Sequence, residues 1–228
     1  MTGDAAVVAA LGAVDSRFTT STTDIELPGG IVRLLHPRNA DDLITEADYV
    51  RDERLPYWAD IWPSSIALAR AMAGLAPRPS RLLELGCGLG LVTISALRAG
   101  HTVLATDYYS DALLFARRNA LAATGREPET RMADWRAWPP DVGVFDHVVA
   151  SDVLYEQSYA GLLASIIATA LVPGGTAFVA DPGRSARESF IGECVARDLL
   201  VSDSLKVPHQ DGAIHQVITI LEIRSQPS

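Results

Sequence analysis

The segment 82–90, which reads L-L-E-L-G-C-G-L-G, has the residue types and spacing of a loop that closely approaches a bound ligand. Glycines at 86, 88 and 90 remove side chains where the backbone must turn sharply. A short apolar segment follows and ends in Asp107. An acidic residue about 20 residues after the first glycine is suited to accept hydrogen bonds from a ribose diol. The pattern therefore predicts a site for a nucleoside-like cofactor.

The spacing of the glycines indicates which kind of cofactor binds. A dinucleotide fingerprint requires G-x-G-x-x-G, because its third glycine allows close packing of the helix on the strand. Leu91 occupies that third position, and the glycines instead read G-x-G-x-G. Glu84 precedes the turn, where a carboxylate would repel a pyrophosphate but would suit a cationic ligand. Both residues argue against a nicotinamide-dependent oxidoreductase.

Two further pairs of acidic and aromatic residues follow segments that we predict to be strands. Asp134 and Trp135 come after 129–133, and Asp152 and Tyr155 come after 145–151. A carboxylate at the end of an apolar strand needs a partner, which favours a ligand role for Asp134, whereas Trp135 has core filling as its alternative. The second pair can face one site where the chain turns. Helix capping by Asp152 and packing of Tyr155 are the alternatives.

The elements that must position these residues alternate along the chain. We predict strands near 81–86, 102–107, 129–133, 145–151 and 175–181, and helices near 90–99, 110–124, 158–171 and 185–198. Two closing strands, 199–207 and 213–223, flank a predicted turn at 208–212. This order predicts an α/β fold with a doubly wound, mostly parallel seven-stranded sheet and one antiparallel edge strand. Ligands bind at the carboxyl ends of such strands.

The first 55 residues form a predicted N-terminal extension. The apolar run 5–14 predicts a brief helix, and the Ser- and Thr-rich segment 16–24 predicts a loop. Alternating residues in 24–35, on both sides of Pro28-Gly29-Gly30, predict a β-hairpin. Pro63 is well placed to open a helix over 64–74. We expect residues 56–228 to form one domain that carries the site.

Composition narrows the class of protein. Hydrophobic residues make up 48% of the 228 residues, which argues against disorder. The net charge of −9 argues against a nucleic-acid groove or an anionic membrane surface as the main partner. The chain has two cysteines, Cys87 and Cys194, too few for a disulfide framework, so we expect a cytoplasmic protein. His209 and His215 have no further ligand nearby, so we expect no metal site.

The run E-L-G-C-G-L-G, followed by Asp107, resembles motifs I and II of the class I S-adenosylmethionine-dependent methyltransferases. The segments P-Y-W-A-D-I-W-P (56–63) and D-V-L-Y-E (152–156) resemble methyltransferase family 16, which includes many lysine-specific protein methyltransferases. With D-P-G-R at 181–184, the chain is similar to the electron-transfer-flavoprotein β-subunit lysine methyltransferases. The resemblance covers about 56–183 and implies a Rossmann-like fold with S-adenosyl-L-methionine as the cofactor.

The resemblance also implies roles for individual residues. Asp152 and Tyr155 are the implied catalytic residues, which hold the incoming nucleophile. The implied cofactor-binding residues are Trp62, Glu84, Gly86, Cys87, Gly88, Asp107, Tyr108, Asp134, Trp135 and Ser151. The expected acceptor is a lysine of a protein substrate. A small-molecule amine or hydroxyl, methylated by the same fold, and a non-catalytic cofactor-binding protein are the alternatives. The acidic stretch 41–53 would be the rim of a protein-binding site or a lid over a small ligand.

Overall fold

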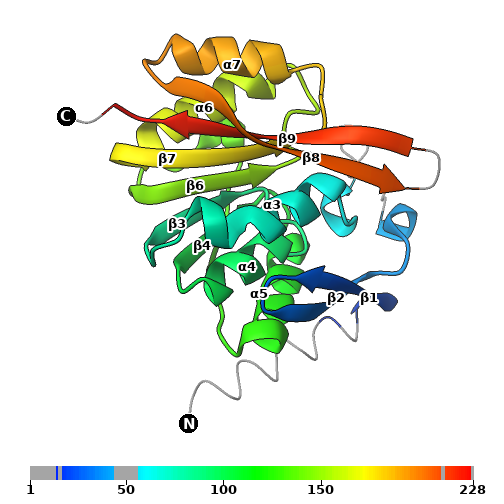
Figure 1. Ribbon diagram of the computed structural model, residues 1–228. Helices are drawn as coiled ribbons and strands as arrows, with labels where there is room; N and C mark the ends of the chain where they lie inside the picture. Colours follow the sequence, from blue (N-terminus) through cyan, green and yellow to red (C-terminus); the bar gives the residue numbers. More distant parts are fainter. Residues whose placement is uncertain (1–13, 15–16, 44–55, 212–213, 227–228) are drawn as a thin grey trace.

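The computed structural model describes residues 14, 17–43, 56–211 and 214–226 (Figure 1). The predicted helix at 5–14 and most of the acidic stretch 41–53 lie outside this part of the chain. The continuous described segment 56–211 carries all of the predicted motifs. None of the described helices combines the length and the apolar character needed to cross a bilayer.

The molecule is built around a seven-stranded sheet with the strand order β5-β4-β3-β6-β7-β9-β8. The bounds are β3 Arg81–Leu85, β4 Thr102–Asp107, β5 Glu129–Met132, β6 Phe145–Ser151, β7 Leu171–Asp181, β8 Leu200–Asp211 and β9 Ile214–Arg224. β9 runs antiparallel to both of its neighbours, whereas the pairs from β5 to β7 are parallel. The predicted α/β class is therefore confirmed. The antiparallel strand, predicted at the edge, lies instead one place inside it.

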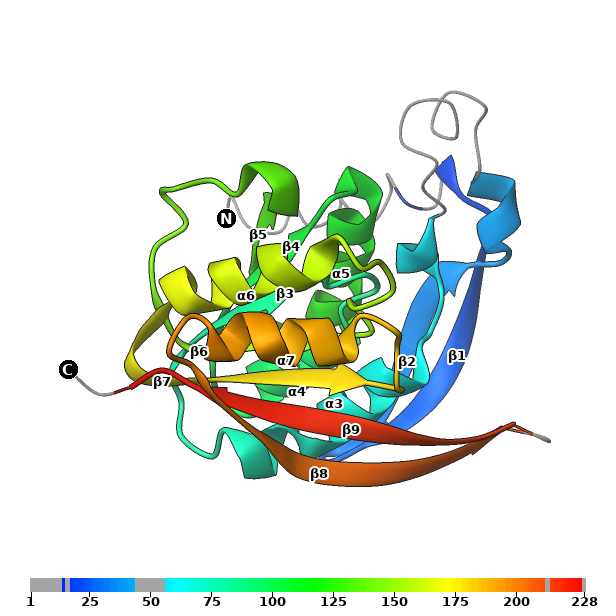
Figure 2. The same cartoon turned by 90° about the horizontal axis from the view of Figure 1, so that it is seen from above.

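Helices cover both faces of this sheet (Figures 1 and 2). One face carries α3 Pro63–Leu75, α4 Leu91–Arg98 and α5 Ser110–Thr124, and the other carries α6 Tyr159–Ala170 and α7 Arg187–Val195. Successive residues of a strand point to opposite faces of the sheet because of the pleat. In β3, Leu82 packs into the core on the face that carries α3, α4 and α5, and Leu83 packs into the core on the face that carries α6 and α7. Three short 3₁₀ turns, η1 Ala40–Leu43, η2 Tyr57–Ala59 and η3 Trp135–Ala137, complete the described elements.

The N-terminal hairpin packs beside α5. It consists of β1 Thr20–Leu27 and β2 Gly30–Pro37, which pair in one continuous register. The predicted hairpin is confirmed, but the predicted loop over 16–24 is wrong from Thr20 onward, because β-branched threonines extend the strand with their side chains largely towards solvent. The Asn119 side chain of α5 joins the hairpin to the loop that follows β3: it forms hydrogen bonds with Leu35 N and O and with Leu89 O, each at 2.9 Å.

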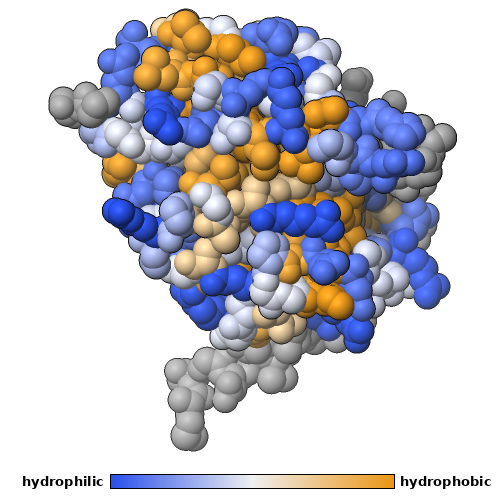
Figure 3. Space-filling view, in the orientation of Figure 1, coloured by the Kyte–Doolittle hydropathy of each residue, from blue (hydrophilic) through white to orange (hydrophobic). Residues whose placement is uncertain are grey.

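The closing hairpin is longer than predicted. Residues 208–211, predicted as a turn, continue β8, and Pro208 pairs with Val217. Proline fits there because β8 is the edge strand, where a missing N–H leaves no partner unbonded. β7 pairs with β9 only as far as Thr219, so the end of the β8–β9 hairpin extends beyond the end of β7 (Figure 2). Figure 3 shows apolar surface at the top of the molecule, near α7. Val195, the last residue of α7, and Leu200, the first of β8, are exposed.

Candidate active site

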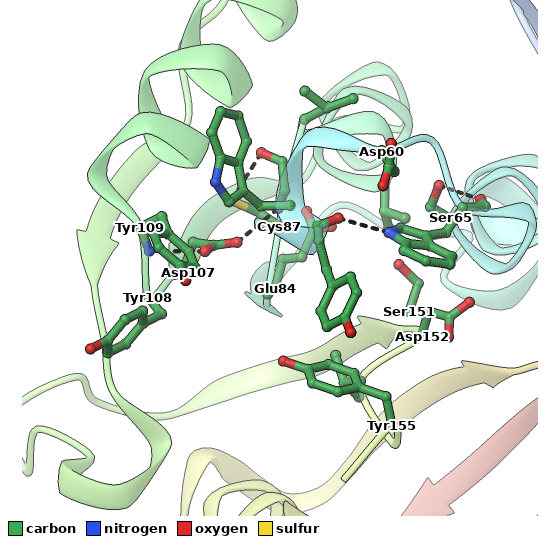
Figure 4. Close-up of a pocket in the computed structure, with 18 of the residues that line it drawn as sticks. Asp60, Ser65, Glu84, Cys87, Asp107, Tyr108, Tyr109, Ser151, Asp152 and Tyr155 are labelled. Atoms are coloured by element: carbon green, nitrogen blue, oxygen red, sulfur yellow. Dashed lines mark hydrogen bonds between the residues drawn. The ribbon is translucent and has the colours of Figure 1, made fainter. Parts of the chain in front are cut away.

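A pocket of about 400 Å³ lies where β3, β4 and β6 end (Figure 4). It contains every residue for which the sequence predicts a role. These are Trp62, Glu84, Gly86, Cys87, Gly88, Asp107, Tyr108, Asp134, Trp135, Ser151, Asp152 and Tyr155. All but Trp62, which directly precedes α3, come together because the carboxyl ends of parallel strands meet at one edge of the sheet. The structure gives their positions, and their roles stay predictions.

The glycine loop forms the floor of the pocket between β3 and α4. Its backbone is held by hydrogen bonds from Cys87 N to Thr106 O at 2.9 Å and from Gly90 N to Cys87 O at 2.8 Å. Gly86 has a φ of +69°, and a Cβ there would lie 3.4 Å from the Trp135 ring. A residue with a side chain at position 86 would therefore have a strained backbone, and the side chain would narrow the pocket beneath the Trp135 ring. This loop fits a ligand that lies against bare backbone.

Asp107 lies at the tip of β4, next to this loop. Its carboxylate accepts hydrogen bonds from Gly88 N at 2.9 Å and from Tyr109 N at 3.0 Å. Burial raises the pKa of Asp107 to about 6, and the backbone N–H groups partly offset that effect. The carboxylate is thus fixed in orientation, as a residue that recognises a pair of ribose hydroxyls must be.

Glu84 lies below the loop with only 1% of its surface exposed. The Thr93 hydroxyl donates a hydrogen bond to its carboxylate. Burial, and to a smaller extent the nearby charge of Asp107, raises the pKa of Glu84 to about 8. A positive ligand charge nearby would favour the ionised form of Glu84. The pocket therefore fits a cofactor that carries a positive charge.

Asp134 and Trp135 form the wall beyond β5. The Asp134 carboxylate accepts a hydrogen bond from Arg136 N at 3.0 Å and pairs with the Arg136 guanidinium at 2.7 Å. Trp135 is half-buried, and its ring meets the Tyr159 ring edge-on with centroids 5.2 Å apart. Trp135 thus both packs against the core and lines the pocket. Its surroundings are compatible with core filling and with a ligand role, the two alternatives for this residue.

Asp152 follows β6 with a φ of +57°, an unusual conformation for a residue other than glycine. Its carboxylate accepts hydrogen bonds from the Ser64 hydroxyl at 3.1 Å and from Arg184 Nε at 2.7 Å. The next helix begins at Tyr159 and has Ser158 at its N-cap position. Asp152 is therefore bound to residues distant in sequence, and the alternative that it caps α6 is wrong.

Aromatic rings surround the mouth of the pocket. The Tyr57 ring meets those of Trp62 and Tyr155 edge-on, with centroids 6.1 and 5.4 Å apart. Tyr155 also meets Tyr159 at 5.4 Å. Trp58, by contrast, is buried against Phe115. Sequence reasoning did not assign Tyr57, Tyr159 or Arg184 to the site, although Tyr57 and Arg184 lie within segments quoted for the family resemblance.

A metal centre and a nucleophilic cysteine are two other kinds of reactive site that a pocket can hold. The described residues contain no group of three or more His, Cys, Asp and Glu side chains placed to hold a metal ion. Cys87 lines the pocket, but burial raises the pKa of its thiol well above the ordinary value, which disfavours the nucleophilic thiolate.

Comparison with known proteins agrees with this geometry. Residues 82–175 match the family model described as "Methyltransferase domain". The chain is 30% identical over 173 residues to the electron transfer flavoprotein beta subunit lysine methyltransferase of Xenopus laevis, covering 74% of this chain and 69% of that protein. It is 28% identical over 115 residues to the protein-lysine methyltransferase METTL21E of Mus musculus, covering 45% of this chain and 47% of that protein.

The fold is also found in solved structures. The magnesium protoporphyrin IX methyltransferase of Synechocystis PCC 6803, solved with bound SAH, matches with a TM-score of 0.56 and 16% identity, covering 72% of this chain and 82% of that chain. With the seven-stranded sheet and the glycine loop in place, the chain belongs to the class I S-adenosylmethionine-dependent methyltransferases, alongside the electron transfer flavoprotein β-subunit lysine methyltransferases.

Proposed function

We propose that this enzyme methylates the side-chain amine of a lysine in a protein substrate. The observation that carries this proposal is the make-up of the pocket, whose described lining has six Asp and Glu side chains, one Arg side chain and several aromatic rings. Such a lining suits a cationic acceptor and its methylated products. The names of the Xenopus and mouse relatives, both lysine methyltransferases, add support.

The mouth of the pocket suits an acceptor that projects from a larger molecule. Tyr57, Asp60, Tyr155 and Glu156 all line the pocket and are also exposed at the surface. A long side chain can therefore enter between them while the rest of its protein stays outside. The two acidic residues there would attract a basic surface around the target lysine.

The other end of the pocket supplies the contacts for S-adenosylmethionine. We assign Asp107 to the ribose hydroxyls, because its carboxylate is oriented by two backbone N–H groups. We assign Asp134 and Trp135 to the adenine, and Glu84 and the glycine loop to the charged end of the cofactor. When bound, S-adenosylmethionine supplies a methyl group whose bond to sulfur breaks, leaving the electron pair on sulfur, as the bond to the acceptor nitrogen forms.

The remaining task of the enzyme is to present a neutral amine. A lysine amine has a pKa near 10.4, so deprotonating it at pH 7 costs roughly 4 to 5 kcal/mol. A partly dry, aromatic-walled pocket lowers that cost, because burial disfavours the charged form. We assign Asp152 to orienting the amine and Tyr155, with Tyr57, to the walls that hold it in line. Positioning then supplies most of the acceleration.

We also place the reaction in the cytoplasm. Cys87 and Cys194 are both free and buried, as expected for a protein from a reducing compartment. The proposal includes no nucleic-acid partner, because the net charge of −9 disfavours one.

Transfer of label from tritiated S-adenosylmethionine to a hypomethylated cell lysate tests the proposal. We expect the wild-type enzyme to label a discrete protein band, and Asp152→Asn to lose that label while still binding the cofactor. Asp141→Asn is the matched control, because Asp141 is an exposed carboxylate outside the pocket that pairs with Arg131. Label found only in small molecules would contradict the proposal in favour of a small-molecule methyltransferase. Cofactor binding without any transfer would indicate a non-catalytic protein.

A further inference from the structure

The carboxylate of Asp152 is bound on both of its oxygen atoms before any acceptor arrives. Arg184 Nε donates to Oδ1 at 2.7 Å, and a terminal guanidinium nitrogen lies 2.7 Å from the same atom. The Ser64 hydroxyl donates to Oδ2 at 3.1 Å. The Asp152 side chain is only 4% exposed, against 35% for Arg184. The guanidinium is therefore the more accessible half of this pair.

Arg184 is held at this position from three directions. Its backbone N–H and that of Gly183 donate to Asp181 Oδ1, at 3.1 and 2.9 Å. Its guanidinium carbon lies 5.5 Å from the centroid of the Trp62 ring, within the range of a cation–π contact. Breaking a pair with so buried a carboxylate would leave an uncompensated charge. The pair is thus a fixed part of the pocket, not a contact that opens at little cost.

The charges of this pair have a direct effect on an amine nearby. A lone carboxylate favours the ammonium form of a lysine, which has no lone pair with which to attack. A guanidinium beside the carboxylate offsets that charge, and as a cation it disfavours a second positive charge. Arg184 is the one lysine or arginine among the described residues that line the pocket.

We infer that Arg184 is a positioning residue that acts through Asp152: it fixes the carboxylate and offsets its charge, so that the acceptor amine is held neutral. The amine gives its proton to solvent before it attacks the methyl group. This inference rests on the proposed methylation of an amine.

Other charged groups near the pair do not replace Arg184. Asp60 and Glu156 lie at the exposed mouth, where solvent screens them. Asp181 is buried behind the turn that carries Arg184, and its charge is offset in part by Arg187. Glu84 lies beneath the glycine loop, on the side assigned to the cofactor. Glu84 keeps its proton in the cofactor-free pocket, so Asp60, Glu156 and Asp181 are the carboxylates that favour an ammonium ion. They add to the need for a cation in the pocket.

The pH dependence of kcat tests this inference in the full chain. In Arg184→Gln we expect the kcat profile to move about one pH unit to higher pH, so that kcat at pH 7 falls about tenfold. KM should stay the same or fall, because an unpaired carboxylate binds the ammonium form well. Arg184→Lys keeps the charge and should restore most of the wild-type profile.

Two kinetic results would overturn the inference. An unshifted profile in Arg184→Gln, with equal losses in kcat and kcat/KM, would mean that the arginine has only a structural role. A lower KM together with a higher kcat would mean that the guanidinium blocks the acceptor. If Arg184→Gln folds poorly, the spectrum of the wild-type protein tests the fixed pair instead, without any acceptor.

A second readout needs no acceptor and so separates this inference from the proposed function. In a ¹⁵N–¹H spectrum at pH 7, the Arg184 Nε–Hε signal, assigned by its loss in Arg184→Lys, should be protected from exchange with water. Asp152→Asn should remove that protection. An unprotected signal in the wild-type protein would show that the pair is not fixed, which overturns the inference. Absence of lysine methylation by the wild-type enzyme, with a protected signal, would contradict only the proposed function.

Discussion

At the scale of single residues, two buried carboxylates define the cofactor end of the pocket. Asp107 and Glu84 both have a raised pKa, mainly because they are buried. Their types and spacing could be predicted from the sequence, because each sits at a fixed distance from the glycine turn. Their protonation could not, because it depends on how the neighbouring elements exclude water.

Asp107 should make cofactor binding depend on pH. Its ionised form accepts hydrogen bonds from hydroxyls. The affinity for the cofactor should therefore stay constant above the Asp107 pKa of about 6 and decline as the pH falls through that value. Calorimetry should show the wild-type affinity for S-adenosylmethionine falling about tenfold between pH 7 and pH 5. Asp107→Ala should bind at least roughly tenfold more weakly at pH 7 and lose most of this pH dependence. Unchanged affinity in the variant would remove Asp107 from the ribose role.

Glu84 should make the stability of the cofactor-free protein depend on pH. Its pKa of about 8 in the folded state exceeds the ordinary value of 4.5, so the folded protein keeps a proton that the unfolded chain has lost. The contribution of Glu84 to stability is therefore full below pH 4.5 and declines as the pH rises towards 8.

Glu84→Gln, which cannot ionise, should gain stability over the wild type as the pH rises. We expect a relative gain on the order of 3 kcal/mol between pH 5 and pH 8, measured by urea unfolding. The glutamine oxygen can still accept the hydrogen bond from Thr93, so packing changes little. Parallel stability curves for the two proteins would mean that Glu84 is ionised in the cofactor-free pocket.

At the scale of elements, most of the strand and helix order could be predicted. Helix α5 begins and ends where the pattern predicts, and β4 and β6 do as well. The predictions are wrong where pairing between strands decides the structure. β1 begins before the predicted hairpin, residues 208–211 continue β8 where the sequence predicts a turn, and β9 lies between β7 and the edge strand β8. Local sequence cannot show which strand a polar or proline-containing segment will pair with.

The contact between α4 and α5 depends on one glycine. Gly90 has a φ of +82°, and a Cβ there would lie 2.8 Å from Ala116 Cα, which is backbone and cannot move aside. Gly90→Ala should therefore combine left-handed strain with a clash and lower the free energy of unfolding by about 3 kcal/mol or more. Gly125 provides the matched control, because its φ is +68° but nothing lies within 4 Å of a Cβ.

Gly125→Ala should lose only about 1 kcal/mol, the cost of the strained backbone. Urea denaturation followed by circular dichroism measures both losses under the same conditions. Equal losses in the two alanine variants would contradict a close α4–α5 contact.

At the scale of the whole molecule, the sheet brings distant segments to one edge. Because parallel strands end together, the sequence alone could predict that residues as distant as Glu84 and Tyr155 share a pocket. It could not predict the pairing of Asp152 with Arg184 and Ser64, since those contacts cross 32 and 88 positions and depend on how the turns after β6 and β7 meet α3. The resulting pocket is acidic and open at an aromatic mouth.

The most direct test of lysine N-methylation is to locate the transferred methyl group. The labelled acceptor from the lysate would be digested and sequenced by mass spectrometry, beside a parallel reaction with Asp152→Asn. We predict methyl groups on the side-chain nitrogen of one or more lysines, present with the wild-type enzyme and missing with the variant. Methyl groups on another residue type, or only on a small molecule, would contradict this prediction.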